Sequence, residues 1–422
     1  MAHKFSLYIR DENLSEVEKV KKRQKLVKSS RTGDFQELFD IHFPVEKAGT
    51  SNCENMIGSI EIPVGLVGPV KVKNFLNVSK NINKDDEVVS VDDIFIPLAT
   101  TEGALIASIN RGCKALTLAN NLSVVINKVG MARALVFECE STLEAYEFVD
   151  WIKNNIKIFA SYCESTSKHL KFLTYQSFIR GRHVYLRFSF DTEEAMGMNM
   201  VTIALKFAWN KVKKDHKKVK LLSLSGNVCT DKKDSVLNRM FGRGFNVELE
   251  AFLSKEILAD IFDVNAKDLV KSHVAKNLVG SNVAGSMAQN MHVANALAAF
   301  YIATGQDPAH VVGGSESSVT FEEAGDGLYV ALTLPTVSVG SIGGGTWLPK
   351  QTQARSLILS GNDEENNTAN STILALCAGV AALAGEISGL CALTNQSLAS
   401  AHQKLARCNF NLRGQVTNTS HE

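Results

Sequence analysis

Four polar side chains next to apolar segments are the first candidates for chemistry in this sequence. Glu102 precedes GALIASINRGCKALTLA, Lys232 follows SLSGNVCTD, Asp307 follows the apolar run FYIATGQ, and His402 comes after a long Ala-rich segment. Because buried charges are costly unless they are paired, we expect these four side chains to meet in one pocket. Such a set suits the reduction of a carbonyl group: the lysine stabilises an oxyanion, the glutamate donates a proton, and the histidine protonates a leaving group.

Each of these residues also has an ordinary structural explanation. Glu102 could interact with a helix dipole, Lys232 could be a surface residue, Asp307 could lie in a turn after a helix, and His402 could be an exposed imidazole at a helix end. The sequence alone does not show that the four side chains converge.

A glycine-rich segment, GSIGGGTW at residues 340–347, follows a strand-like apolar run. Since glycine loses the most backbone entropy on folding, three in succession indicate either a mobile turn or a loop whose N–H groups approach a phosphate or a nicotinamide. Leu348 stands where the G-x-G-x-x-G fingerprint needs its last glycine, and no lysine follows Gly345 as a P-loop requires. Both interpretations stay open on the motif alone.

The composition is that of an ordinary soluble globular protein. The chain has 422 residues, of which 45% are hydrophobic and 21% charged, which is enough for two or three domains. A net charge of +1 gives no global field to recruit nucleic acid or an anionic membrane, and we expect the basic run at 211–220 to be a solvated surface. The N-terminus lacks the apolar region of a signal peptide.

Two further features bear on the compartment and on metals. The apolar segment 373–393 contains Glu386 and many small residues, which favours a tightly packed core helix over a membrane span. Eight scattered cysteines without a CxxC motif predict a reducing, cytoplasmic setting. Ten histidines include no HExxH and no close His/Cys set, so we expect no metal site.

The elements that position these residues can be outlined from capping and periodicity. We expect a helix over 98–119, with Thr100 or Thr101 as its N-cap and Glu102 in its first turn. Residues 1–50 are polar and helix-like.

The composition changes between about residues 135 and 222. Strands at 134–140 and 183–190 alternate there with helices near 142–171 and 198–214. This β-α-β-β-α-like order predicts a small α/β sandwich of the ferredoxin type.

Seven motifs between residues 50 and 407 resemble the class I 3-hydroxy-3-methylglutaryl-CoA reductases. In chain order they are ENMIGSIEIPVGLVGPV, TTEGALIASINRGCKA, EEAMGMNM, SGNVCTDKK, KNLVGSNVAGS, ATGQDPAH and VGSIGGGT. Because all seven occur in order over nearly the whole chain, the resemblance is far more specific than any one of them. It implies a four-electron reduction of the thioester to mevalonate, with two NADPH consumed and CoA released, in the mevalonate pathway to isoprenoids.

The resemblance also implies roles for individual residues. It makes Glu102 the catalytic glutamate, Lys232 the lysine that holds the oxyanion, Asp307 the aspartate that hydrogen-bonds this lysine, and His402 the residue that protonates the CoA thiolate. The family's substrate-binding positions match Arg133, Ser225, Asp231, Lys233 and Lys276, and its CoA-contacting stretch matches Ser108, Asn110, Arg111 and Lys114. The three cations of the first set suit the substrate's free carboxylate.

For the cofactor, the resemblance implies NADPH. The matching positions are Glu194, Met196, Gly197, Met198 and Asn199, the glycines Gly343, Gly344 and Gly345, and, at the 2′-phosphate, Ser167 and Lys168. Glu194 replaces the family's aspartate, and Lys168 offers a point charge where the family usually has an arginine fork. The alternatives are the same scaffold used with NAD(H) in mevalonate degradation, and a non-catalytic CoA-binding paralogue.

The family's architecture implies an α+β fold. We expect a small helical N-terminal domain (1–70), a large mixed helix and sheet domain that binds substrate and CoA (71–134 and 223–422), and an inserted ferredoxin-like domain that binds NADPH (135–222). The resemblance further implies a homodimer or tetramer with active sites shared between subunits. The members of the family that the sequence resembles are the soluble, prokaryotic ones, which have no membrane anchor.

Overall fold

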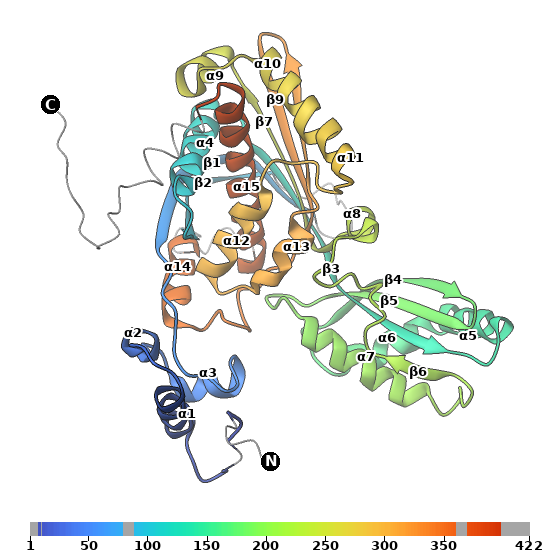
Figure 1. The fold of residues 1–422 in the computed structure, drawn as a ribbon. Coiled ribbons are helices and arrows are strands. Elements are labelled where there is room, and N and C mark those ends of the chain that lie inside the picture. Colours follow the sequence, from blue (N-terminus) through green and yellow to red (C-terminus); the bar gives the residue numbers. More distant parts are fainter. Residues whose placement is uncertain (1–6, 10, 79–87, 360–368, 398–422) are drawn as a thin grey trace.

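The computed structural model describes residues 7–9, 11–78, 88–359 and 369–397 as a mixed helix and sheet fold (Figure 1). The chain begins with three helices, α1 (Glu16–Ser30), α2 (Gln36–Phe39) and α3 (Val45–Ser51). A capping box between Ser15 and Glu18 starts α1. A small apolar cluster joins α1 and α3 to Trp347, from the far end of the glycine-rich segment.

The main sheet has six strands, one of which is the long strand β3. Their order is β2 (Val89–Ala99), β1 (Val64–Val78), β3 (Ser123–Glu138), β7 (Arg243–Leu253), β9 (Gly327–Val337) and β8 (Ser318–Ala324). The β1–β3 pair is parallel and every other pair in this order is antiparallel. The buried side chains of these strands form the largest core of the molecule.

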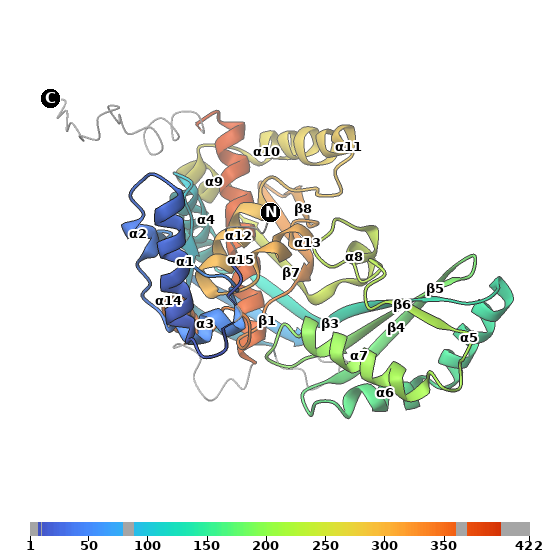
Figure 2. The same cartoon turned by 60° about the horizontal axis from the view of Figure 1, so that its bottom comes forward.

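Helix α15 (Asn370–Thr394) lies in the middle of this core, against α4 (Leu105–Ala119) and α12 (Val293–Thr304) (Figures 1 and 2). Among the described residues it alone is long and apolar enough to cross a membrane, yet its apolar window is wholly buried inside the protein. This confirms the predicted core helix. Gly112 of α4 allows the close approach, because a Cβ there would lie 2.0 Å from the Ala384 carbonyl oxygen of α15.

Shorter helices surround the main sheet. They are α8 (Val236–Phe241), α9 (Lys255–Phe262), α10 (Ala266–His273), the π-helix η1 (Val274–Gly280), α11 (Ser281–Ala284), the 3-10 helix η2 (Pro308–His310), α13 (Val311–Gly314) and α14 (Pro349–Leu359).

A second sheet shares strand β3 with the first. The C-terminal half of β3 pairs with β5 (His183–Asp191) and β6 (Lys220–Ser223), and β5 pairs with β4 (Lys171–Arg180), which gives the order β4-β5-β3-β6. Helices α5 (Thr142–Asn154), α6 (Ile156–Glu164) and α7 (Met198–Val212) accompany these strands. Their apolar residues form a separate core in which Phe137 meets Phe148 and Trp209.

One expected helix begins later than the sequence predicts. Helix α4 starts at Leu105, and its N-cap is Ala104 in a left-handed conformation rather than Thr100 or Thr101. The Thr100 hydroxyl instead accepts a hydrogen bond from the Glu102 N–H group at 3.0 Å and so stabilises a turn. Glu102 therefore lies in an exposed turn before the helix, not in its first turn.

Candidate active site

A cavity of about 410 Å³ lies where several of the sequence motifs meet. Its lining comes from residues 195–200, from Asp231 and Lys232, from the segment 305–310 after α12, and from the glycine-rich segment. The predicted site residues that line it are Met196, Gly197, Met198, Asn199, Asp231, Lys232, Asp307, Gly343 and Gly344. Its volume lies within the usual range of small-molecule sites.

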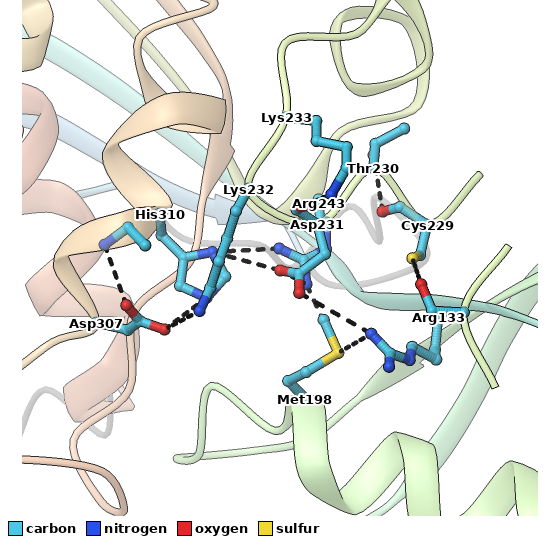
Figure 3. A network of polar contacts seen from close by, with 12 residues as sticks. Arg133, Met198, Cys229, Thr230, Asp231, Lys232, Lys233, Arg243, Asp307 and His310 are labelled. Carbon is cyan, nitrogen blue, oxygen red and sulfur yellow. Dashed lines mark hydrogen bonds and ion pairs between the residues drawn. The ribbon is translucent and has the colours of Figure 1, made fainter. Parts of the chain in front are cut away.

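An ion pair between Lys232 and Asp307 stands at this cavity (Figure 3). Lys232 Nζ lies 2.7 Å from Asp307 Oδ2, while Asp307 Oδ1 accepts the Ala309 N–H group at 3.0 Å at the start of η2. Burial raises the pKa of Asp307, but the hydrogen bonds from Lys232 and Ala309 outweigh it and leave the pKa below its ordinary value. Asp307 is therefore an anion that holds the ammonium in place.

The backbone at Lys232 is unusual, with a φ of +57° in the left-handed region. Non-glycine residues rarely adopt this conformation, which costs about 1–2 kcal/mol. Thr230 and Asn227, earlier in the same loop, also have positive φ angles of +56° and +61°. The loop between β6 and α8 is thus a strained segment that presents Lys232 to the cavity.

A second charged pair lies behind the first. The Arg243 side chain, 1% exposed, donates to Asp231 Oδ1 at 3.0 Å, and its Nη1 lies 3.3 Å from His310 Nδ1. Burial, assisted by the positive charge of Arg243, lowers the pKa of His310 to about 4. The sequence motifs predict no role for Arg243 or His310, although His310 falls within the quoted ATGQDPAH motif.

Three other predicted substrate residues lie beside this pair. Arg133 Nη1 donates to Met198 Sδ at 3.5 Å and lies 3.9 Å from Asp231 Oδ2. Lys233 is exposed, and its Nζ donates to the Asp231 carbonyl oxygen at 3.1 Å. Ser225 Oγ lies 3.3 Å from the Cys229 thiol in the same loop. Of the predicted substrate residues near this pair, only Asp231 lines the cavity itself.

The glycine-rich segment contacts the 194–196 segment through its backbone. Ser341 N–H donates to the Glu194 carbonyl oxygen at 2.8 Å, and the Ser341 hydroxyl donates to the Glu194 carboxylate. A Cβ at Gly340 would lie 2.5 Å from the Met196 nitrogen, so this contact requires glycine.

The next three glycines have different surroundings. Gly343 and Gly344 have φ angles of +83° and +55° with open space around them. Gly345 packs instead against Gly305, whose Cβ, if present, would meet the Gly345 carbonyl oxygen at 2.6 Å.

Glu102 is not part of this cavity. Its Oε2 accepts from Asn295 Nδ2 at 3.0 Å, near the start of α12, whereas Asp307 follows the end of the same helix. A helix of 12 residues is about 18 Å long, so Glu102 and Asp307 lie at opposite ends of α12. Within one chain these two side chains therefore do not meet, and His402 lies outside the described residues.

The predicted CoA-contacting residues lie on α4, also away from the cavity. Arg111 Nε donates to Ser388 Oγ at 3.0 Å, and Ser108 Oγ lies 3.0 Å from the same hydroxyl. Asn110 Oδ1 accepts the Gly68 N–H group at 3.1 Å, and Lys114 is exposed. The predicted ligand-binding residues thus fall into two groups.

The remaining predicted residues are also at the surface. Lys276 is on η1, where its Nζ lies 3.4 Å from Asn277 Oδ1. Ser167 and Lys168 are in the turn between α6 and β4, where Ser167 Oγ accepts the His169 N–H group at 3.2 Å and Lys168 is exposed.

Comparison with known proteins places these motifs in a family. The family model described as "Hydroxymethylglutaryl-coenzyme A reductase" matches residues 19–407. Proteins named 3-hydroxy-3-methylglutaryl-coenzyme A reductase from Haloferax volcanii and Methanocaldococcus jannaschii are both 37% identical to the chain, with 91% of this chain and 92% of each relative covered. A class II enzyme of Streptococcus pneumoniae, solved with NADPH, shares the fold at a TM-score of 0.61 and 17% identity, covering 88% of this chain and 96% of that one.

Proposed function

Because the chain belongs to the hydroxymethylglutaryl-coenzyme A reductase family, we propose that it reduces 3-hydroxy-3-methylglutaryl-CoA to mevalonate and CoA with NADPH. The observation that carries this proposal is the 2.7 Å pair of Lys232 and Asp307 at a cavity lined by the predicted cofactor segments. The reaction belongs to the mevalonate pathway of isoprenoid synthesis.

Lys232 has the chemistry that reduction of a thioester requires. Addition of hydride to the carbonyl carbon places negative charge on its oxygen, and a fixed ammonium group beside that oxygen stabilises the charge by several kcal/mol in a site that excludes water. Asp307 holds the ammonium group at the cavity before the substrate binds. The same lysine can serve the aldehyde in the second reduction.

The residues at the cavity fit a nicotinamide cofactor, which supplies the hydride when bound. The space beside Gly343 and Gly344 is open, so a cofactor could approach their backbone in the cavity that Met196 and Met198 also line. Lys168 and Ser167 would hold the 2′-phosphate of NADPH. Asn199 and Glu194 would bind another part of the same cofactor. A structure that shares this fold was solved with NADPH bound, which supports the choice of cofactor.

A site shared between two chains explains why the predicted residues fall into two groups. Arg133, Ser225, Asp231 and Lys233 lie close to the cavity, whereas Glu102 lies at the other end of α12. We propose that Glu102 donates its proton, and Ser108, Asn110, Arg111, Lys114 and Lys276 contact substrate or CoA, at the cavity of a partner subunit. His402 would protonate the CoA thiolate, because imidazole titrates near neutral pH. The assembly would be a homodimer or a tetramer of dimers.

The finer assignments rest on the same motifs. The chain would be of class I, and 37% identity to the archaeal relatives against 17% to the class II structure supports this. Three separate apolar cores support a division into residues 1–70, 71–134 with 223–422, and 135–222. The strand order β4-β5-β3-β6 supports a ferredoxin-like unit, although β3 itself runs across residue 134. We place the protein in the cytoplasm, bound to neither membrane nor nucleic acid.

The test is a spectrophotometric assay of NADPH oxidation with 3-hydroxy-3-methylglutaryl-CoA, run beside NADH and beside mevalonate with CoA and NAD. We expect NADPH-dependent turnover that Lys232→Ala abolishes while the oligomer stays intact. Lys255→Ala, which removes an exposed lysine paired with Asp326, is the control and should keep wild-type activity. Activity only in the oxidative direction with NAD would favour the degradative alternative. Near-normal turnover of Lys232→Ala would overturn the mechanism, and CoA binding without turnover by the wild type would favour a non-catalytic paralogue.

A further inference from the structure

We propose that His310 is a positioning residue for this reduction: its Nε2–H group takes up the Asp307 carboxylate when Lys232 turns toward the substrate oxygen. The inference rests on the proposed function, because it assigns His310 a part in the same reaction.

His310 lies between the two charged pairs of the site (Figure 3). Its side chain is 2% exposed and lines the cavity at the junction of η2 and α13. Nδ1 faces Arg243 and Asp231, at 3.3 Å and 4.0 Å, whereas Nε2 faces Asp307 Oδ2 at 3.7 Å. The imidazole therefore connects the Asp231–Arg243 pair to the pair that holds the catalytic lysine.

The contact with Arg243 decides where the imidazole carries its proton. A guanidinium group donates hydrogen bonds and cannot accept them, so Nδ1 must be the acceptor and the proton must be on Nε2. Burial is the main cause of the lowered pKa of His310; Arg243 and Lys232 lower it further, while Asp307 and Asp231 act in the opposite direction. His310 is thus a neutral donor whose N–H group is on the Asp307 side.

This N–H group lacks a partner in the state described. Nε2 is buried and makes no hydrogen bond within the described part of the chain, and its 3.7 Å separation from Asp307 Oδ2 is too long for one. A buried donor without an acceptor is costly. The oxygen that could satisfy it is already bonded to Lys232 Nζ at 2.7 Å.

The reaction itself frees that oxygen. When Lys232 Nζ turns toward the developing oxyanion, Asp307 Oδ2 loses its strongest donor, while Oδ1 stays bonded to the Ala309 N–H group. A closure of about 0.8 Å then brings His310 Nε2 within hydrogen-bond distance of Oδ2. The carboxylate stays ionised and in place, so the lysine finds its partner again once the oxyanion is discharged. No covalent bond changes at His310.

Two substitutions of His310 distinguish the roles of its two ring nitrogen atoms. In His310→Gln the amide nitrogen can occupy the position of Nε2 and donate to Asp307, whereas in His310→Asn the shorter amide reaches only the Arg243 side. We expect His310→Gln to keep kcat within about threefold of wild type, and His310→Asn to lower kcat by about 10- to 100-fold, the usual effect of a lost hydrogen bond to a charged group. The KM for 3-hydroxy-3-methylglutaryl-CoA should stay within about twofold in both variants.

The pH profile gives an independent measurement. With one donor fewer, Asp307 is protonated more easily, so the acidic limb of kcat should move to higher pH in His310→Asn but not in His310→Gln. Circular dichroism, melting temperature and gel filtration establish that each variant is folded and assembled like the wild type.

The opposite order of activities, equal loss in both folded variants, or wild-type kcat in both would overturn the assignment. A wild type that does not oxidise NADPH with 3-hydroxy-3-methylglutaryl-CoA would overturn the proposed function and the inference with it. A failure confined to the two variants overturns the inference alone.

Discussion

The side-chain amide of Gln306 forms hydrogen bonds with both the N–H group and the carbonyl oxygen of Gly340. Gln306 Oε1 accepts the Gly340 N–H group at 2.9 Å, and Gln306 Nε2 donates to the Gly340 carbonyl oxygen at 3.0 Å. Because Asp307 is the next residue, this pairing fixes the glycine-rich segment relative to the Lys232–Asp307 ion pair. Two elements of the cavity are thus joined by one amide.

Replacing that amide should weaken both the fold and cofactor binding. Gln306→Met keeps the length of the side chain but leaves the buried Gly340 groups without partners, so we expect a loss of about 1–3 kcal/mol in the free energy of unfolding. The KM for NADPH should rise, because the loop is no longer fixed. Urea denaturation and steady-state kinetics measure the two effects, with the exposed Gln353→Met as control. Unchanged values for Gln306→Met would contradict the structural role given to this residue.

The glycine-rich segment can be tested with a matched pair of glycines. Gly344 and Gly325 have φ angles of +55° and +60°, and both have open space where a Cβ would go. Alanine at either position should cost about 1 kcal/mol of stability through backbone strain. Only Gly344→Ala should raise the KM for NADPH, about fivefold if 1 kcal/mol of binding is lost. If Gly344→Ala binds NADPH like Gly325→Ala does, the segment is a structural turn.

The proposed sharing of the site between two subunits predicts complementation between two inactive variants. Co-expressed Glu102→Gln and Lys232→Ala chains form mixed dimers in which one of the two sites receives both native residues. With random pairing in a two-fold dimer, the mixture should recover about a quarter of wild-type activity. Tandem purification of differently tagged chains isolates the mixed dimers, which should have about half of wild-type activity. A mixture of Glu102→Gln with Glu102→Ala should stay inactive. A mixed dimer without activity would place Glu102 and Lys232 in one chain's site or outside the chemistry.

Glu316 predicts a pH dependence of stability. Burial, and then the charge of Asp234, raise the pKa of this 2% exposed side chain from 4.5 to about 8. Between these two values the folded chain holds a proton that the unfolded chain has lost, so the contribution to stability is full below pH 4.5 and falls as the pH rises to about 8.

A neutral side chain at this position should remove that slope. Glu316→Gln is therefore expected to melt at more nearly equal temperatures at pH 6 and pH 8.5 than the wild type does, as thermal unfolding can measure. The exposed Glu37→Gln serves as the control and should leave the difference unchanged. A wild-type difference retained in Glu316→Gln would mean that other groups cause it.

The sequence could predict motifs and long apolar elements, because those are local properties. The core helix α15, the helix α7, the strand β5 and the end of strand β3 follow from periodicity and composition. The Lys232–Asp307 contact came from the resemblance, and the structure shows it at 2.7 Å.

Contacts between distant segments could not be predicted in the same way. Arg243 meets His310 across 67 positions, and the pairing of Gln306 with Gly340 depends on how the end of α12 meets the loop after β9. The start of α4 was misplaced because the Thr100 hydroxyl bonds within a turn instead of capping the helix. The separation of Glu102 from the cavity follows from the length of α12 along the sheet, which no single motif encodes.

The left-handed backbone at Lys232 has a consequence for protein engineering. Glycine suits that backbone best but lacks the ammonium group, and no other side chain offers both properties. A library selected for thermal stability alone would therefore enrich Lys232→Gly, which relieves about 1–2 kcal/mol of strain and destroys turnover. The residue that is best for stability at position 232 is therefore not the one that activity requires, and residue 232 should be kept as lysine when this enzyme is stabilised by mutation.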